Sequence, residues 1–280
     1  MILFAFIIIN SLNLLSYVNC INMNKKFNQV CWLTSHNSFT SSKYNWIYNQ
    51  QSQSIEDQLE YGVRGLMIDL WWYNNEIYML HGEIKLTRLQ KWSKPNKFEW
   101  LLPIIKKRLD DNPTEIITLI LESYLDTTGG TEIMKLLKKY DMNTLLYNPP
   151  RQQLLRNQWD RIGDMISNNT RLVMISRNIY DKVIYDSGVV IENKWENNDS
   201  GDKFFRSIGN IFIFNHFKKV SFHPYKIYNS FSNIMRRMIN AHKIINKFPN
   251  YVSVDFSQIG DAKNVVDFLN DNPTFANYYL

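Results

Sequence analysis

Short apolar runs separated by helix-like stretches recur along most of this chain, and their order limits the folds that it can adopt. The runs cover residues 30–34, 63–68, 77–80, 116–121, 172–175, 211–214 and 251–254. They lack the apolar–polar alternation of a half-exposed strand, so we expect parallel strands that are buried on both faces. Helical spacing of apolar residues marks 54–61, 100–109, 131–139, 159–166, 234–245 and 262–269. Strands that alternate with helices predict an α/β domain with a parallel sheet.

An irregular (β/α)8 barrel of the TIM type, in a single domain, is the expected architecture. No linker, repeat or low-complexity segment divides the chain, and its 280 residues suffice for one large domain. A barrel needs eight strands, whereas seven runs are visible, and residues 125–159 and 177–210 have no clear assignment. A doubly wound parallel sheet is therefore the alternative fold.

Ionisable side chains follow the carboxyl ends of these runs. His36 comes after the first run, Asp69 ends the second and His81 ends the third. Glu122 and Asp255 follow the runs at 116–121 and 251–254. Because the C-terminal ends of parallel barrel strands meet on one face, where catalytic residues gather, we expect these five side chains to share a site.

The first 20 residues have the pattern of a secretory signal peptide. An unbroken apolar run covers residues 2–9, and Val18 and Cys20 suit the cleavage-site positions, which predicts Ile21 as the mature start. Polar residues interrupt the segment and disfavour a membrane anchor. We therefore expect a secreted protein, with a signal at 1–20, a catalytic domain at 21–280 and no transmembrane span after cleavage. Cleavage leaves Cys31 alone, which excludes an internal disulfide and cysteine-based zinc sites. Sequons at 168–170 and 198–200 fit a secreted surface.

The chain is basic, with a formal net charge of +6 and a pI of about 9.1. This charge favours acidic partners such as anionic lipid headgroups or nucleic acid. A codon bias is an equal explanation, because Asn, Lys, Ile and Tyr are all heavily used. No block of Lys and Arg marks a nucleic-acid tail, so we expect no nucleic-acid partner. Signatures of P-loop enzymes, serine esterases and zincins are absent as well.

Six short sequence motifs together indicate which protein family the chain resembles. Residues 32–39 read WLTSHNSF, 62–70 read GVRGLMIDL and 80–82 read LHG. Residues 117–124 read ITLILESY, 171–176 read RLVMIS and 252–256 read VSVDF. In this order the motifs resemble those of the phospholipase C X domain. The pattern is most similar to the secreted branch that has an X domain alone, the PLC-like phosphodiesterases, over residues 28–270.

This resemblance implies an enzyme, a phosphoric diester hydrolase or phosphorus–oxygen lyase that meets its phospholipid substrate at a membrane surface. It would cleave the glycerol–phosphate bond of phosphatidylinositol-type lipids through a cyclic inositol phosphate. By family position, His36 is the base for the attacking ring hydroxyl and His81 is the acid for the leaving oxygen. Imidazoles suit both roles because they titrate near working pH. Asp255 resembles the carboxylate that orients the first histidine.

The same resemblance implies a calcium site. Asn37, Asp69 and Glu122 offer oxygen ligands of the kind that Ca²⁺ prefers, and the matching positions hold calcium in the animal enzymes. Bacterial members place an Arg at the position of Asp69 and use no metal. The chain departs from the animal pattern at Met67, where a further acidic ligand is expected, so we expect Ca²⁺ to bind more weakly. A polar hydrogen-bond network is the alternative role of these residues.

Arg64 and Trp46 are candidate substrate-binding residues. Arg64 either neutralises the phosphate or forms an ion pair inside the barrel. The ion pair is favoured because Arg64 begins its strand and so points to the face opposite the site. Trp46 lies among aromatic and basic residues after the first motif, and its amphipathic ring suits the headgroup layer of a membrane. Ordinary packing is the alternative for Trp46.

Two other functions stay open. One is a related barrel phosphodiesterase that acts on glycerophosphodiesters or sphingomyelin and also uses paired histidines and a metal. The other is a catalytically silent barrel that binds inositol lipids or phosphates. The absence of an acidic residue at Met67 favours this function, whereas the presence of both histidines argues against it. His216 is the nearest rival as a catalytic histidine but has no motif, while His223 and His242 are expected to be structural or exposed. The sequence does not determine headgroup specificity, acyl specificity or oligomeric state.

Overall fold

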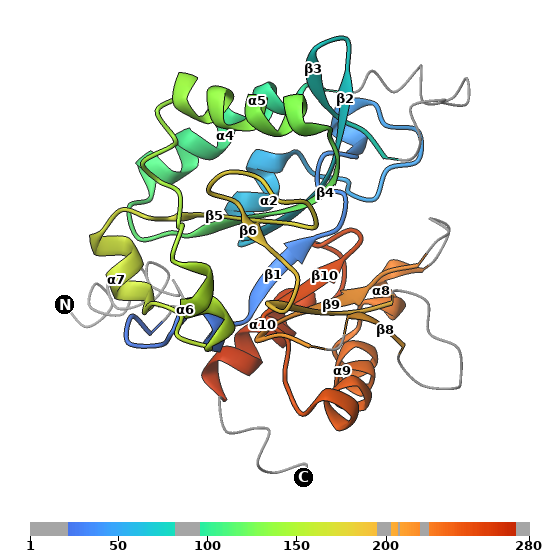
Figure 1. Ribbon diagram of the computed structural model, residues 1–280. Helices are drawn as coiled ribbons and strands as arrows, with labels where there is room; N and C mark the ends of the chain where they lie inside the picture. Colours follow the sequence, from blue (N-terminus) through green and yellow to red (C-terminus); the bar gives the residue numbers. More distant parts are fainter. Residues whose placement is uncertain (1–21, 82–95, 195–202, 207, 219–223, 273–280) are drawn as a thin grey trace, which may run out of the picture.

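The computed structural model describes residues 22–81, 96–194, 203–206, 208–218 and 224–272 (Figure 1). Ten strands form one sheet, of which β3 (Glu76–Met79) and β8 (Phe204–Arg206) are antiparallel to their neighbours and the other eight are parallel. In spatial order the parallel strands are β6 (Ile184–Tyr185), β5 (Leu172–Ser176), β4 (Ile117–Tyr124), β2 (Gly65–Tyr73), β1 (Trp32–Ser35), β10 (Tyr251–Val254), β9 (Ile211–His216) and β7 (Val190–Asn193). The expected signal peptide, the sequon at 198–200 and His223 lie outside the described residues.

This spatial order is the chain order read around a ring, because β10 pairs again with β1. The sheet therefore curls into a barrel. Among the described strands no ladder joins β6 to β7, so the barrel is open at that seam. The expected α/β barrel is confirmed, including its irregularity. The strand order proceeds in one direction around the ring, whereas the strand order of a doubly wound sheet reverses at a switch point.

Six of the seven apolar runs are barrel strands, but the run at 77–80 is not. It forms β3, which pairs antiparallel with β2 and places Met79 opposite Leu70. Asn74 and Asn75 connect the two strands with φ of 50° and 60°, the left-handed conformation that a two-residue hairpin turn requires. The parallel direction expected for this run is therefore wrong. The remaining barrel strands, β6 and β7, come from residues 177–210. β6 has only two residues, and the second half of β7 is polar (Glu192 and Asn193), so neither stands out as an apolar run.

Helices lie outside the sheet (Figure 1). The six expected helices are α2 (Ile55–Tyr61), α4 (Phe98–Asp111), α5 (Thr127–Lys139), α7 (Ile162–Ser167), α9 (Phe231–Ile245) and α10 (Ala262–Asp271). The structure adds α6 (Arg151–Leu155), α8 (Tyr225–Tyr228) and the short 3-10 helices η1 (Phe27–Gln29) and η2 (Ser42–Tyr44). Ser54 begins α2 by accepting a hydrogen bond from the Asp57 amide at 3.1 Å, as expected of an N-cap. In the described part of the chain, no helix is long and apolar enough to cross a membrane.

Alternation along the strands separates the core into two layers. Leu66 and Ile68 of β2 belong to the layer that packs against the helices. Inward-facing residues such as Tyr251 join aromatic side chains at the end where the strands begin, and there Phe27 stacks on Trp159 with centroids 5.4 Å apart. Each buried ring of this size contributes roughly 1.5–3 kcal/mol relative to exposure. Apolar packing thus fills one end of the barrel and leaves the other for polar side chains.

Candidate active site

A pocket of about 310 Å³ opens at the end of the barrel where the parallel strands finish. His36, Asn37, Asp69, His81 and Glu122 all line it. His36 and Asn37 follow β1, Asp69 and Glu122 are paired residues within β2 and β4, and His81 comes from the segment after β3. The structure thus brings together four of the five side chains expected to share a site, with Asn37 beside them, and the fifth, Asp255, contacts the ring of His36.

The ring of His36 is held at its edge and on its face. Its Nδ1 lies 2.8 Å from Oδ1 of Asp255, which is fully buried just after β10. Tyr225 donates its hydroxyl to the other carboxylate oxygen of Asp255 at 3.2 Å. Phe217 stacks on the imidazole with centroids 3.6 Å apart and planes 3° from parallel. Because an ionised Asp255 accepts the Nδ1 proton, Nε2 of a neutral His36 carries the free lone pair.

His81 reaches the same pocket by another route. β2 continues past Asp69, and antiparallel β3 brings the chain back, so that the Leu80 amide donates to the carbonyl oxygen of Asp69 at 3.1 Å. Nδ1 of His81 then lies 3.1 Å from Oδ2 of Asp69 and 2.9 Å from Nδ2 of Asn37. The two imidazole rings of the pocket are 6.4 Å apart and nearly perpendicular, at 86°.

Charge and burial act on these groups in opposite directions. Burial lowers the pKa of His81, but the hydrogen bond and negative charge of Asp69 outweigh it and raise the pKa above the ordinary value. The pKa of Asp69 is raised, chiefly by burial, and the charge of Glu122 adds to the effect. Asp69 and Glu122 are direct partners in the β2–β4 ladder, so their carboxylates project side by side from one face. Two adjacent carboxylates in a partly buried pocket favour a nearby cation.

The candidate metal ligands fit Ca²⁺ in chemical type. Asn37, Asp69 and Glu122 provide two carboxylates and an amide oxygen, which are hard ligands. Within the ranges that the structure describes, no group of three His, Cys, Asp or Glu side chains is arranged as a metal site. Water or substrate oxygens would therefore complete the coordination of an ion held by this set. Met67 lines the same pocket and offers no oxygen from its side chain.

Arg177 and Glu192 also line the pocket and were not predicted from the sequence. Arg177 follows β5, and its guanidinium lies 3.3 Å from Oε2 of Glu192 and 3.8 Å from Oε1 of Glu122. Asn215 donates to the other oxygen of Glu192 at 3.0 Å. The position of Arg177 just after the run at 172–175 is the same signal that marked the other site residues. Glu192 had no such signal, because β7 was not visible as an apolar run.

Arg64 lies away from the pocket, which corrects its assignment as a substrate-binding residue. It precedes β2, forms an ion pair with Glu115 and donates to the carbonyl oxygens of Leu59 and Val63 at 2.6 and 2.7 Å. Asp69 is five residue steps further along the extended strand, a distance of about 16 Å. The ion pair favoured from the sequence is present, at the opposite end of the strand.

Trp46 is buried rather than available to a membrane, which corrects its assignment too. It is 5% exposed and packs edge to face against Phe39, with centroids 5.6 Å apart. The packing alternative was right, because the sequence shows an amphipathic ring but not which side of the loop faces the core. Its neighbours Ile47 and Tyr48 are exposed instead, and so is Ile179 after β5.

The other described histidines have structural environments. His216 is fully buried, with Nε2 3.0 Å from the carbonyl oxygen of Tyr228 and Nδ1 3.1 Å from the guanidinium of Arg237. Burial, reinforced by the positive charge of Arg237, lowers the pKa of His216 to about 3. His242 is buried on α9 and stacks on Phe248. Neither residue lines the pocket.

The sequence matches the model of a known protein family. Residues 22–194, more than half of the chain, match the family model described as PI-PLC X 1. The chain therefore belongs to the PI-PLC X family. A PI-PLC X domain-containing protein of Arabidopsis thaliana is 28% identical over 193 residues, which cover 63% of this chain and 43% of that protein. The matched segment is thus less than half the length of that relative.

Solved bacterial structures share the fold. The phosphatidylinositol-specific phospholipase C of Listeria monocytogenes matches with a TM-score of 0.60 and 16% identity, over 90% of this chain and 97% of that one. A phosphatidylinositol-specific phospholipase C of Staphylococcus aureus matches with a TM-score of 0.56 and 15% identity, over 90% and 96% of the two chains. At these identities the likeness shows the fold alone.

Proposed function

We propose that the protein is a phosphodiesterase that cleaves the glycerol–phosphate bond of phosphatidylinositol-type lipids by acid–base catalysis at His36 and His81. One observation carries the proposal. Two imidazoles share a pocket with their ring centroids 6.4 Å apart, and each has a carboxylate at Nδ1. Membership of the PI-PLC X family supports the substrate class, and so does the fold shared with bacterial phosphatidylinositol-specific phospholipases C.

The two histidines have complementary tasks in this proposal. Neutral His36, with its Nδ1 proton directed to Asp255, accepts the proton of the attacking inositol hydroxyl at Nε2. Protonated His81 donates a proton to the glycerol oxygen as the phosphorus–oxygen bond breaks. The raised pKa of His81 favours the protonated form that an acid needs. The product is a cyclic inositol phosphate, because the attacking hydroxyl belongs to the ring that carries the phosphate.

The rest of the pocket suits a polyhydroxylated ring. Apolar side chains such as Ile120 and Ile213 line it beneath the polar groups, and they suit the C–H edges of the ring. Arg177 and Glu192 provide hydrogen-bond donors and acceptors for hydroxyl or phosphate oxygens. We therefore assign the headgroup to the side of the pocket formed by β5 and β7.

Calcium is the proposed cofactor, held by Asn37, Asp69 and Glu122. When bound, it would offset the negative charge that develops on the phosphate oxygens. Asp69 and Glu122 are neighbours in the β2–β4 ladder, and a bound cation would relieve the repulsion between their carboxylates. Chelation is expected to remove activity and added Ca²⁺ to restore it. Full activity in excess chelator would transfer the role to the cations that line the pocket, Arg177 and Lys218.

The proposed substrate lies in a bilayer, so the mouth of the pocket would face lipid. Ile47, Tyr48, Tyr73 and Ile179 are exposed on segments at or after the carboxyl ends of barrel strands. Apolar and aromatic side chains in such positions insert among lipid headgroups. These residues take the membrane role that the sequence assigned to Trp46.

A phospholipid panel tests the proposal. The purified protein is incubated with vesicles that contain phosphatidylinositol, phosphatidylcholine or sphingomyelin, and with soluble glycerophosphoinositol. Mass spectrometry identifies the water-soluble phosphate product. Cyclic inositol phosphate released from phosphatidylinositol alone is the expected result. A product from sphingomyelin or the glycerophosphodiester would favour the related phosphodiesterases, and binding of inositol lipid with no product would favour the silent barrel.

A further inference from the structure

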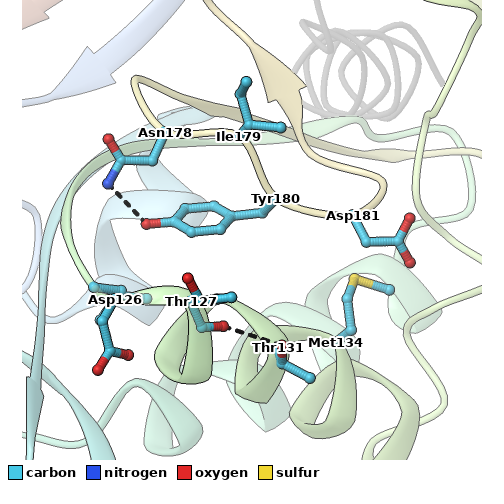
Figure 2. Close-up of a pocket in the computed structure, with 10 residues that line it drawn as sticks. Asp126, Thr127, Thr131, Met134, Asn178, Ile179, Tyr180 and Asp181 are labelled. Carbon is cyan, nitrogen blue, oxygen red and sulfur yellow. Dashed lines mark hydrogen bonds between the residues drawn. The ribbon is translucent and has the colours of Figure 1, made fainter.

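Arg177, which lines the pocket, belongs to the loop that follows β5. Tyr180 of the same loop packs against α5 and is hydrogen-bonded to β4. Figure 2 shows the ring of Tyr180 lying across the first turns of α5, with Asn178 hydrogen-bonded to its hydroxyl at 3.0 Å. The same hydroxyl lies 2.6 Å from Oγ of Ser123, and Asn178 donates to the carbonyl oxygen of Ser123 at 3.0 Å. Ser123 is buried on β4. The residue next to Arg177 is thus tied to the barrel wall through one buried position.

Gly130 of α5 makes room for this ring. A Cβ at Gly130 would lie 2.4 Å from Cδ1 and 2.6 Å from Cε1 of Tyr180. These atoms are in the middle of a rigid ring whose hydroxyl is anchored at Ser123, so the ring cannot turn aside by itself. A glycine inside a helix lowers stability by roughly 0.5–1 kcal/mol relative to alanine. The space that the ring of Tyr180 occupies against α5 accounts for a glycine at this position.

The loop is not closely packed against α5 along its whole length. A pocket of about 490 Å³ is lined by residues of both the loop and α5 (Figure 2). Ile179 is 76% exposed and Asp181 is also exposed, so little other packing holds this part of the loop. A methyl group at Gly130 would therefore displace the loop, and Arg177 with it, rather than disrupt the barrel.

We propose that Gly130 and Tyr180 are positioning residues that hold Arg177 where it binds the headgroup. This inference rests on the proposed function, because it takes Arg177 as a headgroup ligand. A guanidinium recognises oxygens through donors in a fixed planar arrangement, so a small displacement weakens binding. The carboxylates at Nδ1 of His36 and His81 are Asp255, just after β10, and Asp69 on β2, and neither belongs to this loop. The expected signature is a higher KM with little change in kcat.

The test compares Gly130→Ala with Gly129→Ala. Both variants gain the same helix propensity, but the atoms nearest to a Cβ at Gly129 belong to Leu125 and Trp72, at 3.1 and 3.2 Å, rather than to Tyr180. Gly130→Ala is expected to raise KM for phosphatidylinositol vesicles about tenfold, with kcat changed less than about twofold. Amide hydrogen exchange of residues 177–183 is expected to rise in the same variant. Gly129→Ala is expected to change neither quantity.

Two further backgrounds identify the route of the effect. Once Tyr180→Ala has removed the ring, Gly130→Ala is expected to add nothing, and the same holds once Arg177→Ala has removed the guanidinium. An undiminished rise in KM in the Arg177→Ala background would overturn the positioning role. Equal behaviour of the Gly130 and Gly129 variants would overturn it as well. Unmodified protein that turns over no phospholipid is a different result, since it overturns the proposed function and the role of Arg177 together.

Discussion

The two imidazoles of the pocket are held in different ways. His36 has a fully buried partner, Asp255, whose second oxygen is bonded to Tyr225. Its side chain is 16% exposed and is stacked on Phe217. His81 is 45% exposed and follows a hairpin strand outside the parallel barrel. We call His36 with Asp255 the closed arm of the site, because both are largely enclosed. We call His81 with Asp69 the open arm, because His81 is exposed.

This difference matches the tasks proposed for the two residues. A base that accepts a proton through one nitrogen benefits from a fixed tautomer and ring plane, which Asp255 and Phe217 impose on His36. An acid must be protonated, and Asp69 raises the pKa of His81. Asp69 also faces Glu122, so the acid arm and the candidate metal site share one carboxylate. The open arm is therefore the one that a cation would influence.

The largest expected effects come from removing either imidazole. His36→Ala and His81→Ala should each lower turnover of phosphatidylinositol by at least about 10²-fold, the usual loss for general acid–base catalysis. Circular dichroism and thermal unfolding should show that both variants remain folded. A substrate whose leaving group needs no proton distinguishes the arms, because it should rescue His81→Ala more than His36→Ala. Equal rescue would show that the two roles are misassigned.

The carboxylate partners should separate the arms next. Asp255→Asn keeps the shape of the side chain but no longer favours the Nδ1–H tautomer of His36, so kcat should fall by about 10- to 100-fold at every calcium concentration. Asp69→Asn should lower kcat and also raise the calcium concentration needed for half-maximal activity. Steady-state rates across a calcium titration measure both effects. An equal shift of calcium half-saturation in the two variants would contradict the division into a closed and an open arm.

The closed arm was more predictable from the sequence than the open arm. His36 and Asp255 directly follow parallel strands with clear apolar runs, so their meeting follows from barrel geometry. His81 was expected in the pocket for the wrong physical reason, since β3 is antiparallel and returns the chain from the tip of β2. Only pairing between strands decides that direction, and an apolar run of four residues does not reveal it.

The locations of Trp46 and Glu192 were the hardest to predict from the sequence. The ring of Trp46 suits either a membrane or a core, and its burial depends on how the loop after β1 folds back. Glu192 lies in β7, which was not recognised because the second half of the strand is polar. Arg64 shows the opposite case, because its place at the start of a strand correctly favoured an ion pair over substrate contact.

A smaller effect is expected from completing the open arm. Met67 lies on β2 two residues before Asp69, on the same face, and lines the pocket. Met67→Glu should therefore add an oxygen ligand and lower the calcium concentration for half-maximal activity by about three- to tenfold. Met67→Gln, similar in size but uncharged, is the matched control. If both variants shift calcium dependence equally, polarity rather than an added charged ligand is responsible.

A last effect, on stability rather than on activity, tests whether the charge of a histidine's partner distinguishes these environments. His216 ends the barrel strand β9 and stacks on an aromatic ring, Tyr228, but its Nδ1 accepts from Arg237 instead of facing a carboxylate. Its pKa is lowered to about 3, first by burial and then by Arg237. Below the ordinary histidine pKa of about 6.5 the unfolded chain therefore binds a proton that the native state does not.

The free energy of unfolding should consequently fall as the pH drops from about 6.5 toward about 3, by up to about 1.4 kcal/mol per pH unit from this residue. Between about pH 7 and pH 5 the loss should be about 2 kcal/mol. His216→Gln removes the titration and retains an acceptor for Arg237, so urea unfolding should show a gentler pH dependence for the variant even if it is less stable at pH 7. Parallel pH curves for the two proteins would mean that His216 is protonated in the native state. Arg237 would then not keep the ring neutral, and the contrast with the carboxylate-bound histidines would rest on exposure alone.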